Sequence, residues 1–366
     1  MADAALIDWS GGESHLLLNP RMPEGDRRVL QSYVTDLPGH LWLSTSGTTG
    51  ALKLAALSKQ AMLTSAAAVN RHLQSDARDV WCCVLPLFHV GGLGIYARAF
   101  LSRARVVAQE WDSGRFASLE EMTLASLVPA QVSDLVRAGL RPPRLLRAIV
   151  VGGGGMADEL YEAGCALGWP LLPSYGMTET CSQVATATLA SPELILLDHV
   201  KVRTEEGGCL AFRGPSLLTG YGTAEGLVDP KRDGWLVTED LGSVEGRSLR
   251  VEGRRGDFIK IGGESVDLAR LDAILAAIAG PAAALVAVPD PRLGAVIHLA
   301  VDLEVDARAV ADAFNGQVHP YERARAVHRV EKIPRTPLGK LMRAQLLERL
   351  MDESAEPMDE SVGADG

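Results

Sequence analysis

The sequence reads STSGTTGALK at residues 44–53. Small residues let a backbone approach an anion closely, and the hydroxyl and backbone N–H groups of such a loop can donate to phosphate oxygens. Lys53 ends the stretch with a positive charge. The stretch is not a Walker A loop, because GxxxxGK[ST] requires the lysine directly after the second glycine. It therefore indicates a phosphate-binding loop of another kind, and a plain surface turn rich in Ser and Gly is the alternative.

Apolar runs and helix-like segments alternate along the chain beyond this loop. Runs that suit buried strands occupy residues 41–43, 80–87, 104–108 and 146–151. The segments predicted as helices are 58–72, 118–127 and 130–138. Strands that alternate with helices indicate an α/β sheet that is covered on both faces. From residue 207 to 252 the pattern changes to short strands, which are predicted at 208–213, 235–238 and 248–251.

Residues 253–256, Gly-Arg-Arg-Gly, mark a boundary between two domains. Beyond it, the sequence predicts helices at 268–278 and 307–318 and strands at 282–288, 296–303 and 326–330. We therefore expect a large layered α/β domain over residues 1–252, a small α+β domain over 253–350 and an acidic, disordered tail over 351–366. Because ligand sites favour domain interfaces, we expect the functional groups to line a cleft between the two domains.

The composition fits a large globular enzyme or binding protein. The chain has 36 Lys and Arg against 46 Asp and Glu, a net charge of −10, which argues against a general binder of nucleic acid or of membrane surfaces. Five cysteines without paired CxxC spacing indicate reduced thiols rather than a disulfide framework or a zinc site. The sequence has no secretory signal pattern and no apolar run of about 20 residues, so we expect a cytoplasmic protein without membrane insertion.

Two further motifs follow predicted strands. Residues 152–155 are four glycines directly after the strand at 146–151, where a nucleotide can lie against the edge of a sheet. They lack the third glycine of GxGxxG, and a structural turn is the alternative. Residues 174–180 read SYGMTET, in which Tyr175 can stack on a base and Glu179 can ligate Mg²⁺. An ordinary junction between a strand and a loop is the alternative for this heptapeptide.

Six motifs occur in one order between about residues 42 and 343. They are the phosphate-binding loop, the glycine tract, YGMTET at 175–180, WLVTED at 235–240, GRRGDFIK at 253–260 and PRTPLGK at 334–340. In this order they resemble the adenylate-forming (ANL) superfamily, which includes acyl-CoA synthetases, adenylation domains of peptide synthetases and luciferase. The resemblance implies activation of a carboxylic acid by ATP to an acyl-AMP, with Mg²⁺, followed by transfer of the acyl group to CoA.

The resemblance also assigns nucleotide-binding residues, position by position. The residues that match the loop for the β- and γ-phosphates are Thr45, Ser46, Gly47, Thr48, Thr49, Gly50 and Lys53. Those that match the segments flanking adenine are Gly152, Gly153, Gly154, Tyr175 and Gly176. The remaining matches are Thr178 to a phosphate contact, Glu179 to the Mg²⁺ ligand, Asp240 to the carboxylate that accepts both ribose hydroxyls, and Arg254 to a ribose-side partner.

Three residues match catalytic positions and one matches a hinge. Lys340 matches the lysine that bridges the substrate carboxylate and the α-phosphate, where a cation stabilises the charge of the pentacoordinate phosphorus. His89 matches a position near the acyl pocket and thiol entrance, with a structural histidine as the alternative. Lys260 matches the lysine that faces the site during thioester formation, with a solvated strand lysine as the alternative. Gly256 matches the hinge of the mobile C-terminal domain, where glycine can absorb a large φ/ψ change.

The chain departs from the superfamily pattern at several places. Ala51 stands where the family commonly has Pro, and Glu239 replaces the usual Gly before Asp240. Only 43 residues precede the phosphate-binding loop, whereas most members carry a much longer N-terminal subdomain. This short N-terminus, the GGE at 262–264 and the PRTPLGK motif look most like the o-succinylbenzoate–CoA ligases of menaquinone biosynthesis.

Other functions stay open at this point. One is a ligase for another aryl or short acyl acid, and another is an adenylating enzyme that loads a separate carrier protein. A non-catalytic nucleotide-binding relative is the third. The partners that the resemblance implies are small molecules, namely the acid, ATP and CoA, and the sequence leaves open whether the chain forms a homo-oligomer.

Overall fold

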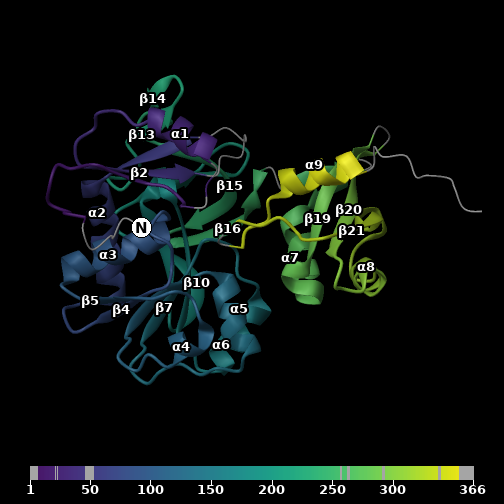
Figure 1. Cartoon of the computed structure of the whole chain (residues 1–366), viewed down its shortest axis with the longest axis horizontal. Helices are drawn as coiled ribbons and strands as arrows, with labels where there is room; N and C mark the ends of the chain where they lie inside the picture. The colour runs from purple at the N-terminus through teal and green to yellow at the C-terminus, as the bar shows by residue number, and fades with distance from the viewer. Residues whose placement is uncertain are drawn as a thin grey trace, which may run out of the picture. The chain divides into compact units, whose positions relative to one another are not determined.

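The structure is a computed structural model that describes residues 7–20, 22, 24–45, 53–255, 258–261, 264–290, 293–336 and 339–353. The chain divides into two compact units, Met1–Glu252 and Gly253–Gly366, which are drawn in purple to teal-green and in green to yellow, respectively (Figure 1). No helix in these described ranges is long and apolar enough to cross a membrane.

The first unit contains an eleven-stranded sheet with a parallel half and an antiparallel half. The parallel strands are, in sheet order, β5 (Arg105–Ala108), β4 (Val80–Cys83), β6 (Leu124–Leu127), β7 (Ala148–Val151) and β8 (Leu171–Met177). The antiparallel strands continue from β8 with β9 (Ser182–Thr188), β10 (Ser191–Leu196), β16 (Ser248–Arg254), β15 (Leu236–Glu245), β12 (Cys209–Arg213) and β11 (Lys201–Thr204).

Helices cover both faces of the parallel half. In β7, Ile149 and Val151 pack into one apolar cluster, whereas Ala148 and Val150 pack into another, because successive residues of a strand point to opposite faces. The helices on the first face are α4 (Ser113–Ala117), α5 (Pro129–Arg137) and α6 (Asp158–Ala166). Those on the second face are α2 (Lys59–Leu73) and α3 (Val90–Ser102) (Figure 1). The expected α/β fold class is confirmed.

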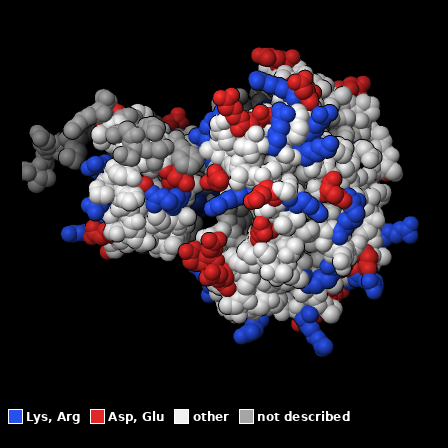
Figure 2. Space-filling view, turned by 180° about the vertical axis from the view of Figure 1, so that it is seen from behind, with Lys and Arg blue, Asp and Glu red and all other residues white. Residues whose placement is uncertain are grey.

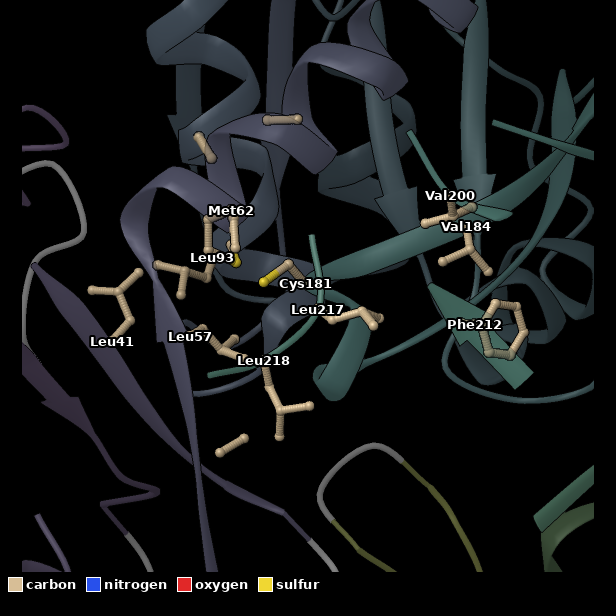
Figure 3. Close-up of a cluster of buried hydrophobic side chains, with 14 of the residues drawn as sticks. Leu41, Leu57, Met62, Leu93, Cys181, Val184, Val200, Phe212, Leu217 and Leu218 are labelled. Carbon is tan, nitrogen blue, oxygen red and sulfur yellow. The ribbon is translucent and has the colours of Figure 1, made fainter. Parts of the chain in front are cut away.

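A second sheet of the first unit carries the ends of the predicted phosphate-binding loop. Its strands are, in order, β1 (His15–Leu17), β2 (His40–Thr45), β3 (Lys53–Ser58), β13 (Gly220–Thr223) and β14 (Gly226–Val228). One face packs on α1 (Glu24–Ser32) through Leu30, which contacts a cluster around Trp42. Leu41 and Leu57 on the other face lie near Met62 of α2 and Leu93 of α3 in a cluster shared with the larger sheet (Figure 3).

The Gly253–Gly366 unit is a small α+β structure with its own core. Its strands are β17 (Phe258–Ile261), β18 (Glu264–Asp267), β19 (Ala283–Asp290), β20 (Gly294–Asp302) and β21 (Ala324–Val330). The sheet order is β18-β17-β20-β19, and β21 pairs with β20. One face packs on α7 (Leu268–Ala279) and α8 (Ala307–Asn315), and the other on α9 (Arg343–Glu353).

The predicted elements differ from the structure at several places, three of which concern the large sheet, the helix beside the site and the chain end. The helix predicted at 118–127 is wrong, because β6 occupies Leu124–Leu127 and is buried in the middle of the sheet. Helix α3 was not predicted, since it begins with a glycine-rich sequence; a Cβ on Gly92 would stand 2.5 Å from Pro86 O. Helix α9 runs to Glu353, into the segment predicted as a disordered tail, and the rest of that segment lies outside the described residues.

The surface carries both signs of charge. On the face seen in Figure 2, Lys and Arg side chains are interspersed with Asp and Glu side chains rather than gathered into one continuous basic surface.

Candidate active site

The glycine tract begins where β7 ends, at Val151. Gly152 lies so close to β8 that a Cβ atom on it would stand 2.8 Å from Ser174 Oγ. Gly153 has a φ of +82°, in the left-handed region that favours glycine. A Cβ on Gly154 would meet no atom within 4 Å. The local fold therefore accounts for glycine at 152 and 153, whereas Gly154 borders open space at the carboxyl end of the strand.

Tyr175 and Asp240 meet although they are distant in sequence. The Tyr175 hydroxyl, on β8, donates a hydrogen bond of 2.6 Å to Asp240 Oδ2, on β15. The backbone of Asp240 is held as well, because its N–H donates to Thr238 Oγ1 at 3.1 Å. The Tyr175 ring also lies 5.9 Å, between centroids, from that of Phe212. The residue predicted to stack on adenine thus contacts the carboxylate predicted to bind ribose.

The residues after Tyr175 form a tight connection between β8 and β9. A Cβ on Gly176 would stand 2.0 Å from Ser182 O, so no other residue fits the backbone there. Thr178 begins the short 3-10 helix η2 (Thr178–Thr180), and its carbonyl accepts from the N–H of Cys181 at 3.0 Å. Glu179 follows and is half-buried. This connection fixes the backbone of the predicted Mg²⁺ ligand.

Glu179 is joined to Lys53 through a residue that the sequence did not single out. The Tyr221 hydroxyl, on β13, donates to Glu179 Oε1 at 2.7 Å, and Lys53 Nζ lies 3.9 Å from the centroid of the Tyr221 ring. Tyr221 lies in a strand, GYGT, that is too short and too rich in glycine for its partners to be read from a pattern.

Two strands flank the predicted phosphate-binding loop. Thr45 ends β2 and is paired with Lys53 at the start of β3, so residues 46–52 connect adjacent positions of two antiparallel strands. Thr45 Oγ1 is buried and has no hydrogen-bond partner within the described part of the chain. Ser46, Gly47, Thr48, Thr49 and Gly50 themselves lie outside the described residues.

His89 precedes helix α3 as its N-cap residue. The side chain makes no capping hydrogen bond, and its Nε2 is buried without a partner among the described residues. Burial lowers the pKa of His89 to about 4, so the imidazole is neutral at pH 7. A neutral, unpaired ring nitrogen at this place can accept or donate one hydrogen bond to a bound molecule.

Arg98 of α3 is a second functional candidate that the motifs missed. The side chain is only 2% exposed, and it donates to Ser126 Oγ at 3.3 Å and to Ser182 Oγ at 3.1 Å. Its guanidinium carbon lies 5.5 Å from the Trp81 ring. Burial lowers the pKa of Arg98 to about 10, and the group remains a cation at pH 7. Across the described residues, no carboxylate forms an ion pair with it.

A buried arginine without a carboxylate is costly, since a charge removed from water needs an opposite charge or full hydrogen bonding. The Nε of Arg98 has no hydrogen-bond partner in the part of the chain that the structure describes. Ser182 begins β9 and pairs with Met177 of β8, so the guanidinium contacts the strand next to the one that carries Tyr175 and Gly176. The signal in the sequence is a single arginine within the otherwise uncharged stretch 90–102, which the absence of a predicted helix obscured.

The remaining predicted residues lie at or after the boundary between the two units, in sequence. Arg254 is the last residue of β16. Lys340 is exposed, and its backbone is held in a turn, with its N–H donating to Thr336 Oγ1 at 3.1 Å and its carbonyl accepting from Thr336 N–H at 2.8 Å. Lys260 lies in β17, opposite Ser265, and its side chain is outside the described part. Gly256 also lies outside the described residues.

Within the described residues, no cluster of three or more His, Cys, Asp or Glu side chains could hold a metal ion. Glu179 alone still suits Mg²⁺, because this ion is usually held by one or two carboxylates together with the phosphates of the substrate and water. Its second oxygen, Oε2, accepts no hydrogen bond from a described residue, whereas Oε1 is taken by Tyr221. The donor set therefore fits a nucleotide-bound Mg²⁺ and not an ion held by the protein alone.

Comparison with known proteins gives one family. The family model described as AMP-binding enzyme matches residues 41–222. The 2-succinylbenzoate–CoA ligase of Bacillus licheniformis is 32% identical over 328 residues, which are 82% of this chain and 68% of the relative.

Solved structures agree with these matches. The o-succinylbenzoate CoA synthetase of Bacillus subtilis, in complex with the acyl-adenylate intermediate OSB-AMP, superposes with a TM-score of 0.74 at 28% identity, covering 84% of this chain and 68% of that one. The same synthetase in complex with ATP and magnesium ion gives a TM-score of 0.73 at 28% identity, covering 84% and 69% of the two chains.

Proposed function

This chain belongs to the family of AMP-binding enzymes that includes the 2-succinylbenzoate–CoA ligases, and we propose that it is itself an AMP-forming acid–thiol ligase for 2-succinylbenzoate. In this reaction the acid carboxylate attacks the α-phosphorus of ATP, which releases pyrophosphate and leaves an acyl-AMP. The CoA thiol then attacks the acyl carbon and releases AMP. We further propose that the reaction takes place in the cytoplasm and that its thioester product serves menaquinone biosynthesis.

The observation that carries the choice of acid is the buried Arg98. 2-Succinylbenzoate has two carboxylates, and only one of them is activated. The second carboxylate can pair with a guanidinium through two parallel, charge-assisted hydrogen bonds. Among the described residues, the Arg98 guanidinium donates only to two serine hydroxyls, and a substrate carboxylate would compensate its charge. We therefore infer that Arg98 selects an acid with a second anionic group.

The nucleotide residues of the first unit suit ATP. We propose that Lys53 contacts the phosphates, that Glu179 ligates Mg²⁺, and that Tyr175 stacks on adenine while Asp240 accepts the ribose hydroxyls. The Tyr175–Asp240 hydrogen bond supports this pairing, because it orients the carboxylate beside the ring that would carry the base. Mg²⁺, when bound, neutralises charge that develops on the phosphate oxygens.

The second unit supplies the remaining proposed groups. We propose that Lys340 bridges the acid and the α-phosphate during adenylation, and its exposed side chain on a backbone-fixed turn is compatible with that role. Adenylation needs Lys340 in the site, whereas thioester formation needs room for the CoA thiol. We therefore propose that Gly253–Gly366 rotates about Gly256 between the two half-reactions and so exchanges Lys340 for Lys260. His89, neutral and with an unpaired Nε2 among the described residues, is proposed to border the acyl group.

A coupled assay of pyrophosphate, AMP and thioester formation tests the proposed function. We expect 2-succinylbenzoate with ATP, Mg²⁺ and CoA to give all three products, and acids without a second carboxylate, such as benzoate, to react far more slowly. Arg98→Met keeps the length of the side chain and should remove most of this preference. Equal rates for benzoate and 2-succinylbenzoate would contradict the role of Arg98. Pyrophosphate release without a CoA thioester would favour a carrier-protein thiol as the acceptor.

A further inference from the structure

Tyr221 contacts two of the residues that the proposed function places at the nucleotide phosphates. Its hydroxyl donates to Glu179 Oε1 at 2.7 Å, and Lys53 Nζ lies 3.9 Å from the centroid of its ring. The three residues come from β13, η2 and β3, respectively. One side chain therefore touches both the carboxylate proposed for Mg²⁺ and the ammonium proposed for phosphate.

The position of Tyr221 is fixed by the strands around it. β13 pairs with β3 so that Tyr221 lies opposite Ala55, two residues after Lys53. Side chains two residues apart in a strand share one face, which places Lys53 beside the Tyr221 ring. Just before β13, the N–H of Leu218 donates to the carbonyl oxygen of Glu179 at 2.8 Å. Backbone hydrogen bonds therefore hold Tyr221 in register with both of its partners.

The hydroxyl restricts the orientation of the Glu179 carboxylate. The terminal torsion of a glutamate is broad and roughly two-fold, so an unheld carboxylate rotates easily. Mg²⁺ requires ligand geometry close to an ideal octahedron, and a carboxylate that must first be ordered binds it less well. The hydrogen bond from Tyr221 takes Oε1 and orients Oε2, which accepts from no described donor.

The ring acts on the lysine. A lysine ammonium sits on a flexible stem, and an aromatic face attracts it through the negative charge of the ring face. Within the described residues, Lys53 and Glu179 form no ion pair with each other, although both contact Tyr221. Without the ring, the Lys53 ammonium and the Glu179 carboxylate would tend to form an ion pair. The lysine would then not be available to the phosphates, nor the carboxylate to Mg²⁺.

We propose that Tyr221 is a positioning residue for the metal–nucleotide complex. Its hydroxyl orients Glu179 toward Mg²⁺, and its ring holds Lys53 toward the phosphates while keeping the two charges apart. This role rests on the proposed use of ATP with Mg²⁺ and adds a residue to that site. It predicts that the two halves of the Tyr221 side chain serve different ligands, the hydroxyl for the metal and the ring for the phosphates.

Two variants separate these halves, and a third serves as a control. Tyr221→Phe removes only the hydroxyl, and Tyr221→Leu removes the ring as well. The matched control is Tyr33→Phe, which removes a tyrosine hydroxyl that has no hydrogen-bond partner among the described residues. Tyr33 lies near β13, since its carbonyl oxygen is 2.5 Å from where a Cβ on Gly222 would be. Isothermal titration calorimetry measures ATP binding with EDTA and over a series of Mg²⁺ concentrations, and pyrophosphate release is measured over the same series.

For Tyr221→Phe we expect ATP binding in EDTA to match the wild type, and the Mg²⁺ concentration for half-saturation to rise about tenfold or more, as for other residues that orient a metal ligand. Excess Mg²⁺ should restore the rate of pyrophosphate release in this variant. Tyr221→Leu should also bind ATP more weakly in EDTA. Excess Mg²⁺ should not fully restore its rate of pyrophosphate release. Tyr33→Phe should behave as the wild type.

An unchanged Mg²⁺ midpoint in Tyr221→Phe would overturn the proposal, and so would equal losses in EDTA and in Mg²⁺, which a merely structural residue would give. If the wild type binds ATP with Mg²⁺ but releases no pyrophosphate with any acid, the proposed ligase activity fails while the calorimetry still decides the role of Tyr221. If the wild type binds no ATP, both fail.

Discussion

The phenolic oxygen of Tyr175 lies 2.6 Å from Oδ2 of Asp240, and this hydrogen bond joins a strand of the parallel half of the large sheet to a strand of its antiparallel half. The two residues are 65 positions apart in the sequence. A ligand that stacks on the ring and bonds to the carboxylate would therefore contact both halves at once. Their substitution gives the first prediction.

Asp240→Ala should weaken ATP binding by about 2–4 kcal/mol, because a carboxylate that accepts two ribose hydroxyls loses two charge-assisted hydrogen bonds. Tyr175→Phe keeps the ring and should weaken ATP by no more than about tenfold. Calorimetric titration with ATP measures both. An unchanged affinity in Asp240→Ala would refute the ribose assignment and direct attention to the neighbouring Glu239.

Lys340→Ala should abolish acid-dependent pyrophosphate release while leaving ATP binding nearly intact. The lysine is proposed to stabilise charge that appears only at the pentacoordinate phosphorus, so the rate of adenylation should fall by about 100-fold or more. Conversion of pre-made acyl-adenylate to the thioester should be spared. Quenched single-turnover measurements of each half-reaction test this, and an equal fall in both would assign Lys340 a structural role.

Gly176→Ala and Gly154→Ala should differ sharply in stability. A Cβ at 176 would stand 2.0 Å from the Ser182 backbone oxygen, so we expect a loss of about 2–3 kcal/mol or more. A Cβ at 154 would meet nothing within 4 Å, and that variant should unfold as the wild type does. If Gly154 borders adenine, its alanine variant should nevertheless bind ATP more weakly. Urea unfolding and ATP titration together separate the two effects.

His199 should make the first unit sensitive to acid. The imidazole is buried, neither ring nitrogen has a partner among the described residues, and burial lowers its pKa from 6.5 to about 4, with Asp198 opposing and Arg71 adding to the shift. Between these pH values the unfolded chain binds a proton that the folded chain does not, so the free energy of unfolding falls as the pH decreases. His199→Leu should reduce this fall by about 2 kcal/mol between pH 7 and pH 4.5.

The measurement is the urea midpoint of the wild type and the variant at both pH values. If the two proteins lose the same stability on acidification, His199 is protonated in the folded state and the burial argument is wrong.

The buried parallel strands could be predicted from the sequence, whereas the glycine-rich helix α3 could not. β7 is covered on both faces, so it needs an uninterrupted apolar run, and the sequence displays that run at Ala148–Val151. Helix α3 escaped prediction because its glycines at 91, 92 and 94 contradict helix propensity and are explained only by close packing.

The residues of the candidate site also fall into those that the sequence could indicate and those that it could not. Tyr175, Glu179 and Asp240 could be named from motifs, since each motif is local and contiguous. Tyr221 and Arg98 could not, because what distinguishes them is a contact made across the fold. The Arg98 guanidinium meets two serine hydroxyls from different strands, and no pattern along the chain reveals which hydroxyls will face it.

The order of strands in the large sheet has a consequence for how the protein is made. β16 lies between β15 and β10, and it pairs with β10 through Leu194 opposite Leu249. A nascent chain or a recombinant fragment that stops before residue 248 therefore has β10 with one unpaired edge, and exposed strand edges recruit other chains into aggregates. A fragment limited to residues 41–222, the range of the family model, also lacks β15 and with it Asp240. Synthesis must therefore pass β16 before the two parts of the large sheet on either side of this strand can be joined.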